Sequence, residues 1–189
     1  IFLLILYPLF YWGLRRDLKK FTAAILIVLI YAGGGVNPIA RGTASIYKHD
    51  VMDKILEITA KNQDLWLVVS DVTFNNDIPI MGGAPTINSV NIYPDLQRWG
   101  KLDISGKNHD IYNRYAHITV QLTQGETVFS LKAPDSFVVN LNIDDLSILN
   151  VRYIYTDKNL DGLHGQKVRL VKEIEKNGIS IYQVNFVNQ

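Results

Sequence analysis

The 189-residue chain contains no cysteine, which excludes a disulfide framework and a thiolate metal site. It also has little excess of charge of either sign, since 19 lysines and arginines are balanced by 18 aspartates and glutamates. A protein that follows a phosphate backbone needs a basic excess, so the composition argues against a nucleic-acid partner.

The sequence also lacks the short motifs that mark metal, phosphate and nucleophile sites. None of its four histidines lies at a zinc-binding spacing from another histidine or a glutamate, and no G-x-S-x-G elbow is present. The Gly82-Gly83 pair fits no phosphate-binding glycine pattern and predicts a sharp turn. Residues 157–162, DKNLDG, alternate Asp and Asn as a calcium loop does, but Val168 replaces the closing glutamate. We therefore expect a polar turn there, and predict no metal, cofactor or identifiable catalytic residue.

Charge is nearly absent from residues 1–40, where every charged side chain falls within residues 15–20, RRDLKK. The uncharged run 21–40 is long enough to cross a hydrocarbon core of about 30 Å at about 1.5 Å per residue. The run 1–14 is too short to do so alone and predicts the end of a longer helix. Because the chain also starts at Ile1 rather than methionine, we expect it to be the C-terminal part of a larger protein.

The basic connection orients these two segments. Lysine and arginine in short loops stay in the cytoplasm, so we expect Arg15, Arg16, Lys19 and Lys20 at the cytoplasmic face. Residues 1–40 are then two transmembrane helices of a multi-pass cell-membrane protein, and residues 41–189 form an extracytoplasmic domain. A signal peptide is the first alternative, but it would carry its basic cluster before a single apolar run. A helical hairpin buried in a soluble core is the second, and the basic connection disfavours it.

Residues 41–189 mix helix and strand patterns and predict an α/β domain with a mixed sheet, with α+β as the alternative. Apolar positions within residues 44–61 have helical spacing, and short helices are expected at 93–103 and 143–150. Strand patterns occupy residues 66–70, 115–123, 127–133, 137–142 and 151–156. Residues 168–186 predict a C-terminal β-hairpin around Asn177-Gly178, whereas 71–92 and 157–166 are expected to be loops and 105–110 a turn.

Aromatic rings and polar donors gather in residues 91–99 and 112–118, next to the long loop 71–92. Aromatic faces with a few amide or guanidinium donors suit a sugar or a lipid-linked phosphate. The alternative is that the aromatic side chains belong to the core and that Arg114 is a surface or paired charge. The candidate ligand-binding residues are Tyr93, Arg98, Trp99, Asn113, Arg114 and Tyr115.

Four stretches of this region carry a family resemblance: SVNIYPDLQRW, NRYAHI, DDLSILNVRYIYT and ISIYQVN. Together with the two preceding apolar segments, they resemble the extracytoplasmic C-terminal domain of polytopic bacterial membrane proteins of the GT-C glycosyltransferase type, including YfhO-like proteins. The resemblance implies assembly or modification of a cell-envelope polysaccharide or teichoic acid. The implied partners are the lipid bilayer and a lipid-linked sugar or cell-surface glycan.

The same resemblance limits what this chain itself is expected to do. The acidic catalytic residues of GT-C enzymes lie in outside loops near the first membrane helices, so no catalytic residue is assigned here. We expect an accessory, non-catalytic domain. The alternative is a non-catalytic membrane-anchored domain that binds a glycan or a partner at the cell surface. A transporter or channel fragment is a third hypothesis, which the large folded tail disfavours.

Overall fold

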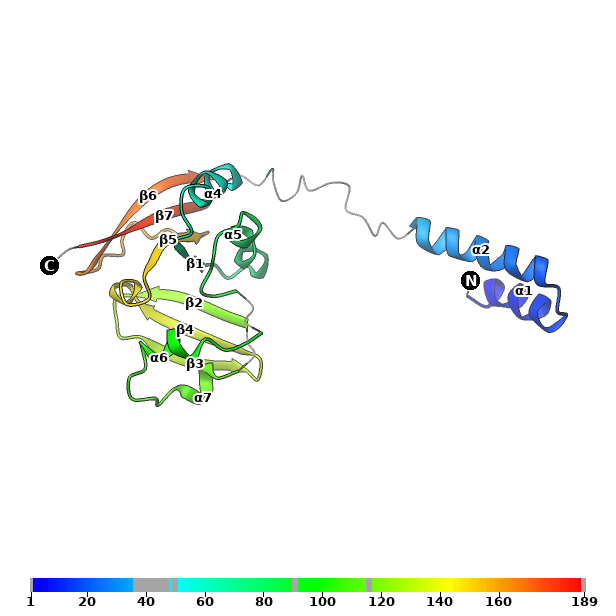
Figure 1. Ribbon diagram of the computed structural model, residues 1–189, viewed down its shortest axis with the longest axis horizontal. Helices are drawn as coiled ribbons and strands as arrows, with labels where there is room; N and C mark the ends of the chain where they lie inside the picture. The colour runs from blue at the N-terminus through cyan, green and yellow to red at the C-terminus, as the bar shows by residue number, and fades with distance from the viewer. Residues whose placement is uncertain (1, 36–47, 49–50, 90–91, 115–116, 188–189) are drawn as a thin grey trace. The chain divides into compact units, whose positions relative to one another are not determined.

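The computed structural model describes residues 2–35, 48, 51–89, 92–114 and 117–187 (Figure 1). It divides into two compact units, Ile1–Ala44 and Ser45–Gln189, and each is described by itself.

The first unit is a hairpin of two helices, α1 (Phe2–Leu14) and α2 (Leu18–Gly35). The helices pack closely near their connection, where a Cβ on Gly13 would lie 3.4 Å from the ring of Phe21. In the turn, the Asp17 carboxylate accepts a hydrogen bond from the backbone N–H of Lys20 at 3.3 Å. Both apolar runs are thus helical, although residues 36–40 of the second lie outside the described residues. Among the described residues, no helix has the length and apolar character needed to cross a bilayer.

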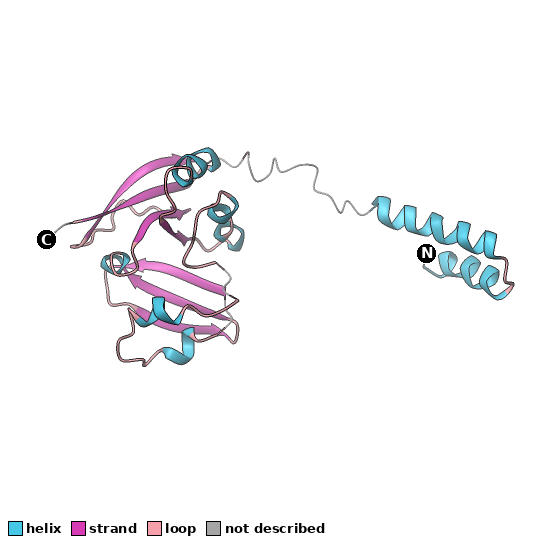
Figure 2. Ribbon diagram, in the orientation of Figure 1, coloured by secondary structure: helices cyan, strands magenta, loops and turns pink. Residues whose placement is uncertain are grey.

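The second unit contains two mixed β-sheets (Figure 2). The four-stranded sheet has the order β1-β5-β7-β6, where β1 (Leu65–Val69) and β5 (Val151–Thr156) are parallel. Its other strands, β6 (Val168–Lys176) and β7 (Ile179–Phe186), form the antiparallel hairpin. The three-stranded sheet has the order β2-β4-β3, built from β2 (His117–Thr123), β4 (Ser136–Asn142) and β3 (Val128–Ala133).

The mixed α/β class is confirmed, and the hairpin turns at Asn177 and Gly178, which have φ values of 51° and 80°. The expected helix at 44–61 is described only as α4 (Met52–Thr59), since most of 44–50 lies outside the described residues. The expected loop 71–92 contains two short helices, η1 (Thr73–Asn76) and α5 (Ile78–Met81). The last two residues of the expected turn at 105–110 are helical and begin a third, α7 (His109–Tyr112). The other two short helices were expected and are α6 (Leu96–Gly100) and η2 (Ile143–Leu146).

Two apolar cores hold this unit together. The larger one combines residues of both sheets and includes Trp99, Phe129 and Phe137. The smaller one packs α4 against residues of β1, β5 and β7, with Trp66 stacked on Tyr153 at 4.9 Å between ring centroids. The four-stranded sheet therefore has one face in each core, which explains why β1 is apolar along its whole length.

Candidate functional site

Trp99, the central aromatic residue among the candidates from the sequence, is fully buried. Its ring makes edge-to-face contacts with Phe129 and Phe137, at centroid distances of 5.9 and 6.0 Å. Its position in α6 places it in the larger core, to which Tyr112 of α7 also belongs. A side chain in this position packs the domain and has no surface to offer to a ligand in water.

The other candidates do not gather around it. Arg98 pairs with Asp95 at 3.0 Å, Tyr93 and Asn113 are exposed, and Tyr115 lies outside the described residues. Arg114 donates to three backbone carbonyls, those of Ile111 at 2.7 Å, Pro134 at 3.0 Å and Asp110. Arg114 thereby ties the end of α7 to the β3–β4 turn, and this structural role occupies its guanidinium.

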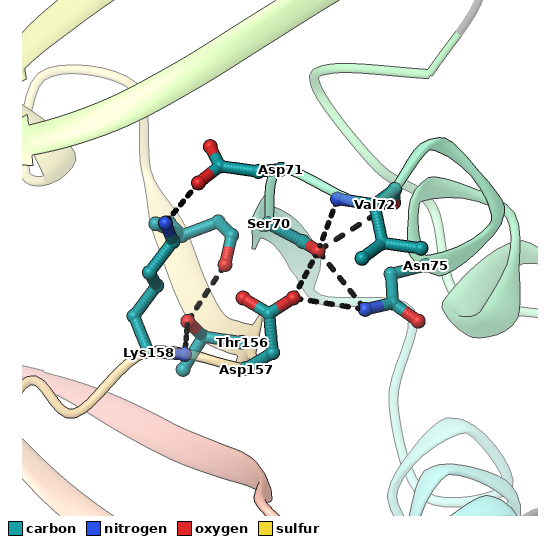
Figure 3. Close-up of polar contacts among 8 residues, drawn as sticks. Ser70, Asp71, Val72, Asn75, Thr156, Asp157 and Lys158 are labelled. Atoms are coloured by element: carbon teal, nitrogen blue, oxygen red, sulfur yellow. Dashed lines mark hydrogen bonds and ion pairs between the residues drawn. The ribbon is translucent and has the colours of Figure 1, made fainter.

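A polar cluster that sequence reasoning missed lies where the parallel strands β1 and β5 end (Figure 3). Ser70 follows β1, Asp157 follows β5, and their side chains meet because the carboxyl ends of parallel strands share one sheet edge, where α/β proteins often bind ligands. The Ser70 hydroxyl donates to Asp157 Oδ2 at 2.6 Å and accepts from Asn75 Nδ2 at 2.9 Å. Asn75 also donates to Asp157 Oδ2 at 3.2 Å. We call Ser70, Asn75 and Asp157 the strand-end cluster.

Two further contacts join the same strand ends. Thr156 Oγ1 donates to the carbonyl of Val69 at 2.7 Å and accepts from the backbone N–H of Lys158 at 2.9 Å. The Lys158 ammonium pairs with Asp71, and this hydrogen bond raises the pKa of Lys158. Asp157 Oδ1, by contrast, is buried without a hydrogen-bond partner in the described part of the chain. The hydrogen bonds from Ser70 and Asn75 thus hold Asp157 Oδ2 in place, and Oδ1 of the same carboxylate is a buried acceptor.

Beyond Asp157, the loop 157–167 covers a cavity of about 470 Å³ against β6 and β7, which we call the loop pocket. This volume lies within the range of small-molecule sites, about 300–1,000 Å³. One part of its wall is apolar, and the remainder is polar or charged. The polar and charged residues are Asp161, His164, Arg169, Lys172 and Tyr182. A smaller hollow of about 200 Å³ is lined by Asp157, Lys158 and Glu175, and it shares Lys172 with the loop pocket.

Lys172 is the centre of the charged wall. Its ammonium lies 2.9 Å from Asp161 Oδ2 and 2.8 Å from Glu175 Oε2, and hydrogen bonds to Glu175 and then Asp161 raise its pKa. The hydrogen bond from Lys172, followed by that from Tyr182, lowers the pKa of Asp161. The Tyr182 hydroxyl donates to Asp161 Oδ1 at 2.9 Å, and burial raises the pKa of this phenol.

A β-bulge places Lys172 on this wall. The register between β6 and β7 shifts between Lys172, which is opposite Tyr182, and Ile174, which is opposite Ile181. Lys172 therefore faces the loop pocket, while Ile174 packs against the core beneath α4. Such bulges commonly redirect a side chain beside a functional site.

The calcium-like residues of the loop point in different directions. Asp157 binds Ser70 and Asn75, whereas Asp161 binds Lys172 and Tyr182. The side chain of Asn159 accepts a hydrogen bond from the backbone N–H of Asp161 at 2.8 Å, which closes a local turn. Across the described ranges, no three His, Asp or Glu side chains lie close enough to hold a metal ion.

The chain belongs to the family known as a domain of unknown function, DUF7654, whose model matches residues 45–188. Neither the curated proteins nor the solved structures with which the chain was compared gave a match.

Proposed function

We propose that this chain is a membrane-anchored, non-catalytic part of a GT-C glycosyltransferase-like protein that assembles or modifies a cell-envelope polysaccharide or teichoic acid. In this proposal the α1–α2 hairpin lies in the bilayer and residues 45–188 form an accessory domain outside the cytoplasm. The observation that carries the proposal is the apolar surface of the hairpin.

Both helices of the hairpin expose large apolar side chains. Leu14 of α1 is 83% exposed, and Ile30 and Tyr31 of α2 are 72% and 80% exposed. Leaving one such side chain in water rather than burying it costs roughly 1.5–3 kcal/mol. Surfaces of this kind mark contacts with a membrane or another protein. Among the described residues of this unit, all charges lie at positions 15–20, and this segregation favours the bilayer over a protein partner.

The length of α2 sets a condition on the proposal. Lys19 and Lys20 lie in its first turn, so its uncharged part, residues 21–35, has 15 residues and reaches about 22 Å at about 1.5 Å per residue, less than a hydrocarbon core of about 30 Å. From residue 21 through residue 40 the sequence carries no charge, so a full crossing requires the segment after Gly35 to take part. The basic turn would then face the cytoplasm, and the chain would emerge on the opposite side.

The glycosyltransferase part of the proposal is supported by the sequence resemblance of SVNIYPDLQRW and DDLSILNVRYIYT. The loop pocket supports a binding role, because a cavity of ligand size with ordered polar side chains is more than packing requires. This observation also favours the second candidate, a non-catalytic anchored domain that binds a glycan or partner at the cell surface without a glycosyltransferase parent.

Protease protection tests the orientation. Protease added outside intact cells should digest residues 45–188 and leave a membrane-bound fragment that contains the hairpin. Protection of the whole domain until the cells are lysed would contradict the proposal, as would recovery of the full-length protein without membranes.

A second experiment separates the two candidates. Deleting the codons for residues 45–188 in the complete gene should reduce an envelope polysaccharide while the remaining membrane protein keeps its abundance. An unchanged polysaccharide with normal abundance would remove the glycosyltransferase candidate and leave the binding domain.

A further inference from the structure

We propose that the loop pocket binds a small sugar or polyol that carries a carboxylate or phosphate group. This inference deepens the proposed function, on which it rests for the carbohydrate class, and it names the site and the chemistry of the ligand. Three features of the pocket support it: a preformed shape, a fixed set of polar groups, and an exposed guanidinium that has no partner among the described residues.

The shape is fixed by the way the loop is anchored. The Asp144 carboxylate accepts hydrogen bonds from the backbone N–H groups of Gln166 at 3.0 Å and Lys167 at 2.7 Å. At the adjacent Gly165, an added Cβ would come within 2.9 Å of Val168 and still closer to Asp144. The backbone therefore approaches η2 and β6 as closely as glycine allows. A cavity held in this way loses little conformational entropy when it is filled.

The fixed polar groups suit hydroxyl ligands. Asp161 offers carboxylate oxygens, and Lys172 offers an ammonium held between two carboxylates. A sugar hydroxyl both donates and accepts, so neighbouring hydroxyls can bind this acceptor and this donor together. Leu160, Leu163 and Leu170 line the pocket and give the C–H surface of a sugar ring an apolar contact. A wholly apolar ligand would instead exclude water from the charged groups. It would offer no hydrogen bonds in place of those that these groups make to water, which is unfavourable.

The anionic group is inferred from Arg169 and His164. Both side chains line the pocket, both are exposed, and neither has a hydrogen-bond or ion-pair partner in the part of the chain that the structure describes. Lys172 is already paired with Asp161 and Glu175, so among the described residues of the lining Arg169 is the cation left available to an anionic group. A free guanidinium fits a carboxylate or a phosphate through two parallel hydrogen bonds, which adds affinity and orientation.

The test uses the full chain in lipid nanodiscs and isothermal titration calorimetry with four probes: glucuronate, glucose 6-phosphate, glucose and inorganic phosphate. At least one of the two anionic sugars should bind with a dissociation constant below about 1 mM, and at least about tenfold more tightly than glucose or inorganic phosphate. Comparing glucuronate with glucose 6-phosphate distinguishes a carboxylate from a phosphate ligand.

Two variants locate the binding site. Arg169→Ala should weaken binding of the anionic sugar at least about tenfold without changing the melting temperature, because the side chain is exposed. Lys132→Ala, an exposed cation on β3 in the other sheet, removes the same charge and should leave binding unchanged.

The inference is overturned if neither anionic sugar binds, if inorganic phosphate binds equally well, or if the two variants have equal effects. These results do not depend on the orientation of the hairpin. Failure here with the domain accessible outside the cell would reject the ligand and keep the proposed function. If an anionic sugar binds but the domain proves to be cytoplasmic, the ligand is kept and the proposed function is rejected.

Discussion

Replacing Trp99 with alanine removes one of the largest fully buried side chains of the domain. The indole packs edge-on against Phe129 and Phe137 in the core that joins the two sheets. The substitution would leave a cavity bounded by residues of α6, β3 and β4, which regular secondary structure prevents from closing fully.

The expected cost follows from the burial and the ring contacts. A Trp→Ala change in a core costs about 3–5 kcal/mol, and two lost edge-to-face contacts favour the upper part of this range. For a chain of this size, each kcal/mol lowers the melting temperature by about 2–4 °C, so a loss of about 4–5 kcal/mol corresponds to roughly 8–20 °C. Because small domains have a total stability of about 5–15 kcal/mol, the variant should be close to unfolding.

Circular dichroism of the full chain in detergent measures this loss without relying on tryptophan fluorescence. Tyr93→Ala is the matched control, since Tyr93 precedes the same helix and is 85% exposed. It should change stability by no more than about 0.5 kcal/mol. If Trp99→Ala lost less than about 1 kcal/mol, or no more than Tyr93→Ala, the assignment of Trp99 to the core would be wrong.

Other substitutions test the strand-end cluster, the smaller core and the loop pocket. Ser70→Ala should cost about 1–3 kcal/mol in urea unfolding, because Asp157 loses its closest donor in a partly buried site; an unchanged midpoint would argue against the cluster. Gly82→Ala should cost about 1–3 kcal/mol, since its Cβ would lie 2.5 Å from an isoleucine methyl of α4, whereas Gly162→Ala meets no atom within 4 Å and should be tolerated. Asp161→Asn tests a pH dependence. The hydrogen bonds of Asp161 lower its folded-state pKa below 3.8, so its stabilisation is present above that pH and is lost as the pH falls through the lowered value. The gap in melting temperature between wild type and Asp161→Asn should therefore be constant near neutral pH and close in acid; a gap that widened in acid would contradict the assignment.

Strands with a strong local pattern could be predicted from the sequence. β5 has a nearly continuous apolar pattern, and the β6–β7 hairpin carries the Asn-Gly turn signal, so both were expected where they occur. The four-residue helices α5 and α7 were not expected, because so short a segment has little propensity of its own and depends on tertiary contacts.

The strand-end cluster could not be predicted because it depends on which strands pair. Ser70 and Asp157 each follow a predicted strand, but their meeting requires the parallel pairing of β1 with β5, which are far apart in sequence. The available signal in the sequence was that a polar residue directly follows each of the two strands. For Trp99 and Arg114, residue type left both alternatives open. An aromatic ring and a guanidinium suit a ligand site or internal packing equally well, and only burial and the three carbonyl acceptors of Arg114 decide between them.

Labelling of single cysteines in intact cells tests the proposed orientation most directly, and these 189 residues add no cysteine of their own to the background. Lys101→Cys places a thiol at an exposed position after α6, and Lys19→Cys places one in the first turn of α2 beside the basic connection. A membrane-impermeant maleimide should label Lys101→Cys in intact cells and Lys19→Cys only after permeabilisation. Labelling of Lys19→Cys in intact cells with protection of Lys101→Cys, or equal labelling of both, would contradict an extracytoplasmic domain anchored by the helical hairpin.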